Sequence, residues 1–194
     1  DEITCVAGIP VTTPARTAFD LGRFLPRGPA LERLDALMRA RPFLFGEVMR
    51  LAERYRGARG VARLKDILPL VDSGAASLPE SRLRLLYIDA GLPRPTTQIP
   101  ILDEWGRVVR TVDMGWERFM VASEYDGGQH QTDREQYVKD LRVLPKLARL
   151  GWDVMQVIKE DRKADVVARA VRALHARGWD GTTDETAIPQ RKCG

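Results

Sequence analysis

The stretch TQIPILDEWGRVVRTVDMGWERFMVASEYDG, residues 97–127, decides the fold class of this 194-residue chain. Short runs of apolar and β-branched residues are separated there by turn residues, which predicts three consecutive strands. We expect these strands at residues 97–102, 107–114 and 119–125, with a turn at residues 103–106. Because short turns join neighbouring strands, the strand ends are expected to lie side by side in one small sheet.

Helices are predicted on both sides of this three-stranded segment. The sequence Ser77-Leu78-Pro79-Glu80 begins one helix, which Gly91 ends. Downstream we expect a helix at residues 133–150 that Pro145 should bend or interrupt, a strand at residues 152–158 and a helix at residues 164–176. This order of elements predicts an α/β unit, of mixed α+β type, with about four strands flanked by helices.

The first third of the chain is predicted to be a small all-helical region. Thr13 before Pro14 is a favourable N-terminal cap, and apolar residues recur at helical spacing through the segments that follow. Small and polar residues at 72–76 form the predicted linker. We therefore expect a helical accessory region at residues 1–72, the α/β domain at 73–178 and a loose polar tail at 179–194.

Composition restricts the class of protein. With 44% hydrophobic and 30% charged residues the chain can bury a core, and no apolar run is long enough to cross a membrane. Two cysteines and two histidines exclude a disulfide framework and a Cys/His zinc site, so we expect a reducing cytoplasm. The net charge of +4 is compatible with DNA as a partner without requiring it. The chain starts at Asp1 rather than Met, so we expect an N-terminal portion to be missing.

Three carboxylates occupy the ends of two predicted strands. Asp113 closes the second strand, and Glu124 and Asp126 share one face at the end of the third. Converging carboxylates repel one another unless a cation lies between them, and Mg²⁺ accepts carboxylate oxygens while keeping water for phosphodiester hydrolysis. The alternative is that these acids form ion pairs with nearby arginines. The candidates are Arg110, Arg118 and Arg142.

A wider pattern surrounds these acids: a strand-end aspartate, an E-x-D-G strand end and a following histidine. Its residues are Val112, Asp113, residues 121–127, His130, Asp140, Leu147, Gly151, Trp152 and Val154. Over residues 80–160 this pattern resembles the DUF559 branch, similar to very-short-patch-repair endonucleases, of the restriction-endonuclease-like PD-(D/E)xK nuclease superfamily. The segment GIPVTTPARTAFDL at residues 8–21 resembles the helical region of AbiEi-type antitoxins, which follows a winged-helix module.

The nuclease resemblance implies a restriction-endonuclease-like core with Mg²⁺, or alternatively Mn²⁺, held by Asp113 and Glu124. It also implies that Glu80 is a further acid of the site and that Asp126 stands where the superfamily signature carries lysine. The role of that lysine, orienting the attacking water, is then assigned to His130, whose imidazole suits proton transfer near neutral pH. The other candidates for this role are Gln129 and Lys139.

Two positions depart from the family pattern, and three residues have a simpler structural explanation. Val143 and Gln156 stand where, or near where, this branch commonly carries arginine, which affects the expected phosphate contacts more than metal binding. Glu80 also fits a capping box with Ser77 at the start of its helix. The remaining alternatives are a plain loop position for His130 and a cap or ion pair for Asp140.

The leading hypothesis is a cytoplasmic, Mg²⁺-dependent DNA endonuclease with a helical accessory region. Its expected site residues are Asp113 and Glu124 as metal ligands, with Asp126, His130 and Glu80 as catalytic or supporting groups. The alternative is a non-catalytic, antitoxin-like DNA-binding regulator that uses the same fold as a scaffold. A third hypothesis is a protein-interaction domain. The expected partner is DNA and not a membrane, no oligomeric state is indicated, and a winged-helix module is expected before residue 1.

Overall fold

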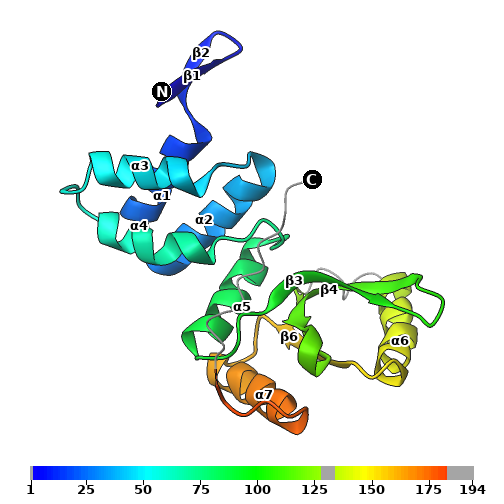
Figure 1. The fold of residues 1–194 in the computed structure, drawn as a ribbon. Helices are drawn as coiled ribbons and strands as arrows, with labels where there is room; N and C mark the ends of the chain where they lie inside the picture. Colours follow the sequence, from blue (N-terminus) through cyan, green and yellow to red (C-terminus); the bar gives the residue numbers. More distant parts are fainter. Residues whose placement is uncertain (1, 128–133, 183–194) are drawn as a thin grey trace. The chain divides into compact units, whose positions relative to one another are not determined.

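The structure is a computed structural model that describes residues 2–127 and 134–182, with the backbone alone for residues 134–141. The chain divides into two compact units, Asp1–Arg82 and Leu83–Gly194, which we name the helical unit and the sheet unit (Figure 1). The predicted boundary between residues 72 and 73 falls before helix α5 (Leu78–Asp89), whose first turn belongs to the helical unit. Among the described residues, no helix combines the length and the apolar character that a membrane span needs.

Helices form the core of the helical unit, as their apolar spacing predicts. Thr13 caps α1 (Pro14–Phe24) by accepting a hydrogen bond from the Arg16 backbone N–H at 3.3 Å, and Pro14 occupies the first helical position. The core side chains include Phe19 and Leu64, both completely buried. The other helices are α2 (Arg27–Ala40), α3 (Phe45–Arg54) and α4 (Val61–Ile67), followed by a 3₁₀ turn, η1, at Leu68–Leu70.

The helical unit starts with a β-hairpin that the sequence did not predict. β1 (Ile3–Val6) and β2 (Ile9–Thr12) pair antiparallel, and every residue in both strands is exposed. Ala7 and Gly8 form the two-residue turn with φ of 49° and 81°, the left-handed backbone that tight hairpins require. The prediction of an all-helical region at residues 1–72 is therefore wrong at its start. Exposure on both faces leaves no alternating pattern, and Pro10 inside the second strand argues against a strand.

The elements of the sheet unit after α5 are β3 (Thr96–Leu102), β4 (Val108–Trp116), β5 (Val121–Asp126), α6 (Arg134–Arg149), β6 (Asp153–Ile158) and α7 (Lys163–Ala176). The strands form one mixed sheet in the order β3-β4-β5-β6. β4 pairs antiparallel with β3 and β5, whereas β6 runs parallel to β5. The third strand starts at Val121 rather than at residue 119, because residues 117–119 form a 3₁₀ turn and Met120 has a left-handed φ of 53°.

Two hydrophobic clusters place helices on opposite faces of this sheet (Figure 1). One cluster joins α5 and α7 to the sheet through residues that include Tyr87 and Trp116. The other joins α6 to the sheet through residues that include Ile99 and Leu147. The predicted class, mixed α/β with four strands flanked by helices, is confirmed. Of the two expected effects of Pro145, bending or interruption, interruption does not occur, because α6 continues through Pro145 as one helix.

The Tyr87 hydroxyl is buried inside the first of these clusters. It shares a hydrogen bond of 2.8 Å with Ser123 Oγ, and burial raises the pKa of Tyr87 from 10.0 to about 12. The unfolded chain therefore releases this proton at a lower pH than the folded chain. The contribution of Tyr87 to folding stability is complete below pH 10 and is lost as the pH rises toward about 12. We expect the free energy of unfolding to fall by about 1.4 kcal/mol per pH unit in this window.

Urea denaturation between pH 8 and pH 11, followed by tryptophan fluorescence, measures this fall in stability, because all four tryptophans lie in the sheet unit. Tyr87→Phe should remove this part of the pH dependence. It should also lower stability by about 1 kcal/mol near neutral pH, because the buried Ser123 hydroxyl loses its partner. Equal pH slopes for the wild type and Tyr87→Phe would contradict the prediction.

Candidate functional site

Asp113 lies where the pairing between β4 and β5 ends. The ladder between these strands closes at the pair Met114 and Ser123, one residue beyond Asp113. An Asp113 carboxylate oxygen accepts a hydrogen bond from the Tyr125 backbone N–H at 2.7 Å. The side chain thus takes the place of a strand carbonyl and holds the end of β5 against β4.

Glu124 lies on β5 and faces α6. Ala122, two residues earlier, packs in the cluster beneath α6, and side chains two apart on a strand share a face. The Glu124 carboxylate accepts two hydrogen bonds from Arg110 of β4, Nε to Oε1 at 2.7 Å and Nη2 to Oε2 at 3.1 Å. Charge-assisted pairs of this two-pronged kind are stronger than neutral hydrogen bonds. The alternative that a strand-end acid pairs with an arginine is confirmed for Glu124, and Arg110 is that arginine.

The other predicted site residues lie elsewhere. Asp126 ends β5, half-buried, and pairs with Ile158 of β6 in the ladder. Glu80 lies in the first turn of α5, where its carboxylate accepts hydrogen bonds from the Ala76 N–H and the Ser77 hydroxyl, each at 2.8 Å. The Glu80 backbone N–H in turn donates to Ser77 Oγ at 3.3 Å, so Ser77 and Glu80 cap the start of α5, which is the structural explanation of Glu80. The predictions for His130 and Gln129, and for the side chains of Lys139 and Asp140, lie outside the described residues.

These positions do not fit the Mg²⁺ or Mn²⁺ ion that the nuclease resemblance implies. Both oxygens of Glu124 are held by Arg110, and the Asp113 carboxylate is held by the Tyr125 N–H. Within residues 2–127 and the side chains described from residue 142 to 182, no group of three or more His, Cys, Asp or Glu is arranged to hold a metal ion. The structure therefore does not bring Asp113, Glu124 and Asp126 together as a metal-binding group.

Val143 and Gln156, the two positions that depart from the family pattern, both lie in the sheet unit. Val143 is half-buried and packs in the cluster beneath α6. Gln156 pairs with Glu124 across β5 and β6, and its carbonyl accepts a hydrogen bond from Arg169 of α7 at 3.2 Å. Arg169 in turn forms an ion pair with Asp161 at 2.6 Å. The arginine near Gln156 is therefore Arg169, which reaches β6 from helix α7 instead of lying on the strand.

A second candidate surface lies on the helical unit, where α3 leads into α4. Residues 50–65 contain six basic residues against one acidic residue, Glu53, and all six basic residues are exposed. The sequence signal is this local imbalance, which acids elsewhere partly offset when charge is summed over residues 1–72. We name the six residues the basic corner: Arg50, Arg54, Arg56, Arg59, Arg63 and Lys65.

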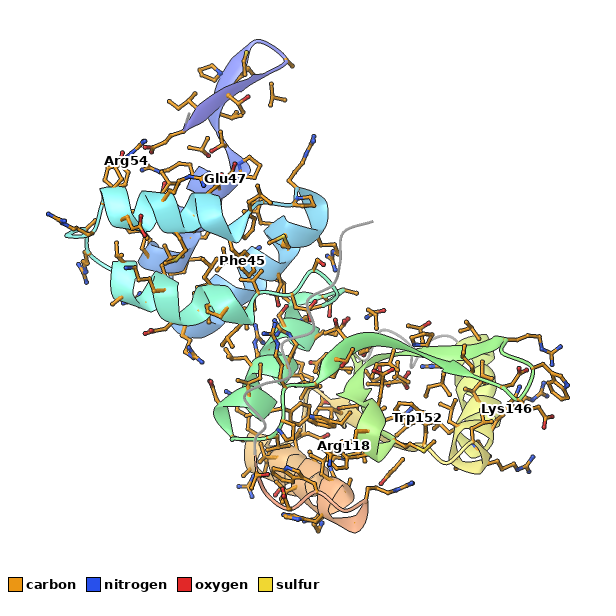
Figure 2. The ribbon with its side chains drawn as sticks, viewed as in Figure 1. Phe45, Glu47, Arg54, Arg118, Lys146 and Trp152 are labelled. Carbon is orange, nitrogen blue, oxygen red and sulfur yellow. The ribbon has the colours of Figure 1, made fainter. Side chains whose placement is uncertain are left out.

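Some members of the basic corner are held by neighbouring groups. Arg54, on α3 (Figure 2), forms an ion pair with Glu2 at 2.7 Å. Arg50 pairs with Glu47 at 3.9 Å, and Arg63 donates a hydrogen bond to the Leu25 carbonyl at 2.9 Å. The remaining exposed cations have no ion pair with an acid of the described part of the chain. These cations are Arg56, Arg59 and Lys65. Their charge is available to an anionic partner in solution.

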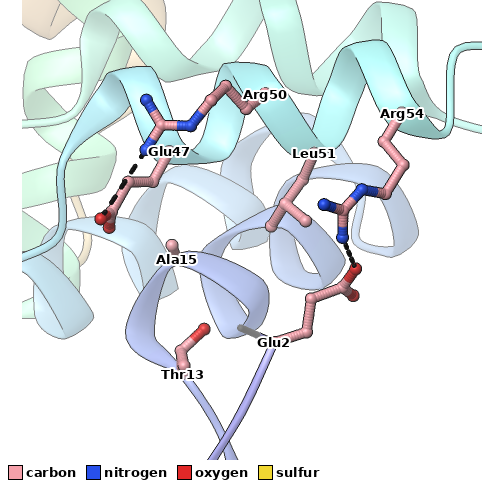
Figure 3. Close-up of a pocket in the computed structure, with 7 residues that line it drawn as sticks. All are labelled: Glu2, Thr13, Ala15, Glu47, Arg50, Leu51 and Arg54. Atoms are coloured by element: carbon pink, nitrogen blue, oxygen red, sulfur yellow. Dashed lines mark hydrogen bonds and ion pairs between the residues drawn. The ribbon is translucent and has the colours of Figure 1, made fainter.

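A pocket of about 210 Å³ lies beside the basic corner, between the start of α1 and α3 (Figure 3). Its two arginines face its two acids, with Arg54 at 2.7 Å from Glu2 and Arg50 at 3.9 Å from Glu47. A hydrogen bond from Arg16 lowers the pKa of Glu2 below its ordinary value, so Glu2 stays ionised. The charges of the pocket are therefore balanced within the pocket itself.

The first part of the chain matches a known protein family. Residues 1–70 match the family described as the AbiEi antitoxin C-terminal domain, which supports the resemblance of residues 8–21. Two uncharacterized proteins of Mycobacterium tuberculosis, from strains CDC 1551 and H37Rv, are each 34% identical over 172 residues, which is 87% of this chain. The chain spans 63% of the length of these relatives. No solved structure matches the chain. None of these matches supports the nuclease resemblance.

Proposed function

We propose that this chain is a non-catalytic, antitoxin-like DNA-binding regulator in which the sheet unit serves as a scaffold. The antitoxin-like part is supported by the family match over residues 1–70. DNA as the partner is supported by the basic corner, which lies within those residues. The observation that carries the proposal is the group of exposed cations without an acidic partner among the described residues, Arg56, Arg59 and Lys65.

The chemistry of the basic corner suits the DNA backbone better than base edges. A guanidinium offers parallel N–H donors to phosphate oxygens, and each neutralised phosphate releases condensed counterions. Phosphate contacts position a protein on DNA without reading its sequence, so we expect binding that depends strongly on salt.

The triple variant Arg56→Ala/Arg59→Ala/Lys65→Ala should bind duplex DNA more weakly than the wild type. For each phosphate that the variant no longer neutralises, the slope of log affinity against log salt should become shallower by about 0.9. The affinity near 0.1 M salt should fall roughly tenfold for each such phosphate, because fewer counterions are released on binding. Fluorescence anisotropy of a labelled duplex, titrated at several salt concentrations, measures both quantities.

The matched control removes one lysine and two arginines from exposed positions on α7: Lys163→Ala/Arg172→Ala/Arg177→Ala, the last just past the helix end. It lowers the net charge equally and should leave the salt slope close to that of the wild type. An equal decrease in affinity in both triple variants would assign binding to net charge rather than to the basic corner. A wild type that fails to bind DNA at low salt would refute the proposal.

A metal-dependent endonuclease is the second candidate. The observation that favours it is the mixed sheet between helical layers, with Asp113 and Glu124 on adjacent strands near the end of their ladder. The described arrangement does not fit a metal ion, because Arg110 holds Glu124. Incubation of the same DNA with Mg²⁺ or Mn²⁺ separates the candidates. Cleavage that Asp113→Ala abolishes would favour the nuclease, and intact DNA is the result expected of the regulator.

A further inference from the structure

We infer that Arg110 is the built-in cation of the sheet unit and that it excludes a divalent metal ion from Glu124. Acidic side chains that gather at strand ends need a positive charge to balance them. The guanidinium of Arg110 supplies this charge from the same sheet, through hydrogen bonds of 2.7 and 3.1 Å to the two carboxylate oxygens. The inference concerns β4 and β5 alone, so it stands or falls separately from DNA binding.

The sheet register places Arg110 where it can reach Glu124. Arg110 lies opposite Ile101 in the β3–β4 ladder, just before an irregularity between Ile101 and Leu102 shifts the pairing. Ile101 and Val112 both pack in the cluster beneath α6, so Arg110 belongs to the face that Glu124 shares. The side chains of Arg110 and Glu124 are only 27% and 8% exposed. The ion pair is therefore a fixed part of a covered face and not a contact between long surface side chains.

A metal ion would compete poorly with this guanidinium. Arginine stays protonated throughout the usual pH range, so a change of pH does not remove the cation. Its planar fork matches both carboxylate oxygens, and a metal ion would have to displace two charge-assisted hydrogen bonds and then remain beside a positive charge. One oxygen of the Asp113 carboxylate is already engaged, because it accepts the Tyr125 N–H at 2.7 Å.

The consequence is an acidic site that is electrostatically complete without a metal. Wild-type protein should not take up a divalent cation at Glu124. Removal of the guanidinium should have the opposite effect, because Glu124 and Asp113 would then lie on adjacent strands without this balancing charge. Carboxylate oxygens without a neighbouring cation are the ligands that Mg²⁺ and Mn²⁺ bind.

Mn²⁺ titration followed by the electron paramagnetic resonance signal of the free ion tests this directly. We expect Arg110→Met to bind Mn²⁺ at least about tenfold more tightly than the wild type, because a nearby positive charge is gone. The gain should disappear in Arg110→Met/Glu124→Gln. Arg107→Met is the matched control, since Arg107 lies just before β4 and pairs with Asp103 at 3.0 Å instead of Glu124. It should bind Mn²⁺ no better than the wild type.

Glu124-dependent Mn²⁺ binding by the wild type would overturn the inference. A folded Arg110→Met that gains no binding would overturn it equally, and tryptophan fluorescence reports whether the sheet unit is folded. If Arg110→Met does not fold, Arg110→Lys takes its place. Lysine keeps the charge but cannot cover both oxygens with a planar fork, so a smaller gain is expected. A folded Arg110→Lys without any gain would count against the inference.

Discussion

Phe19→Ala is expected to lower the free energy of unfolding of the helical unit by about 3–5 kcal/mol. Phe19 is completely buried in α1, its ring centroid lies 5.6 Å from that of Tyr55, and the Arg23 guanidinium lies 5.0 Å from it. Truncation removes the ring together with its contacts to the apolar neighbours. It leaves a cavity that the neighbouring helices can fill only in part. Circular dichroism during urea unfolding measures the disappearance of helix.

Phe24→Ala is the matched control, because Phe24 ends the same helix but is 62% exposed. Its stability should stay within about 0.5 kcal/mol of the wild type. Tryptophan fluorescence follows the sheet unit separately, since all four tryptophans lie there. A Phe19→Ala variant no less stable than Phe24→Ala would show that Phe19 does not hold the helical unit together.

Gly60→Ala is expected to destabilise the helical unit by about 3 kcal/mol, through backbone strain and overpacking together. Gly60 precedes α4 with a φ of 85°, a conformation that alanine adopts only under strain. A Cβ atom at this position would lie 2.1 Å from the carbonyl oxygen of Arg23, so the backbone itself would have to move. Thermal unfolding followed by circular dichroism measures the effect.

Gly57→Ala provides the comparison within the same loop. A Cβ atom at Gly57 would meet nothing within 4 Å, so its stability should remain within about 0.5 kcal/mol of the wild type. Because Gly60 lies inside the segment that carries the basic corner, Gly60→Ala should also weaken DNA binding, whereas Gly57→Ala should not. Equal stability of the two variants would contradict the close approach of Gly60 to α1.

The sequence predicts elements well where end signals and periodicity agree. Thr13 and Pro14 mark the start of α1, and Gly91 marks the end of α5, so these boundaries could be placed closely. The hairpin of β1 and β2 could not be predicted, because neither face is buried and Pro10 is unfavourable inside a strand. A strand can be predicted from alternating apolar and polar residues when one of its faces is buried, and neither face of this hairpin is buried.

In the candidate site, the sequence predicts where the acidic residues lie but not which side chains they pair with. Period-two alternation and hairpin length place Asp113 and Glu124 on adjacent strands, as the structure has them. The choice of arginine partner depends on cross-strand register, which no local pattern in the sequence specifies. Arg110 was one of three candidates, and the β3–β4 register assigned it to the face beneath α6. The basic corner was missed because its charges, taken over the whole region, are partly offset by acids elsewhere.

The parallel pairing of β5 with β6 imposes an order on the folding of the sheet unit. β3, β4 and β5 follow one another through short connections, so their pairing joins residues that are close in the chain. β6 reaches β5 only after residues 127–152, including α6, have closed a longer loop, at a larger entropic cost. We therefore expect the antiparallel strands to assemble first and β6 to dock afterwards. The Arg110–Glu124 pair needs only β4 and β5, so it should form early in folding, and closure of the long connection should limit the folding rate.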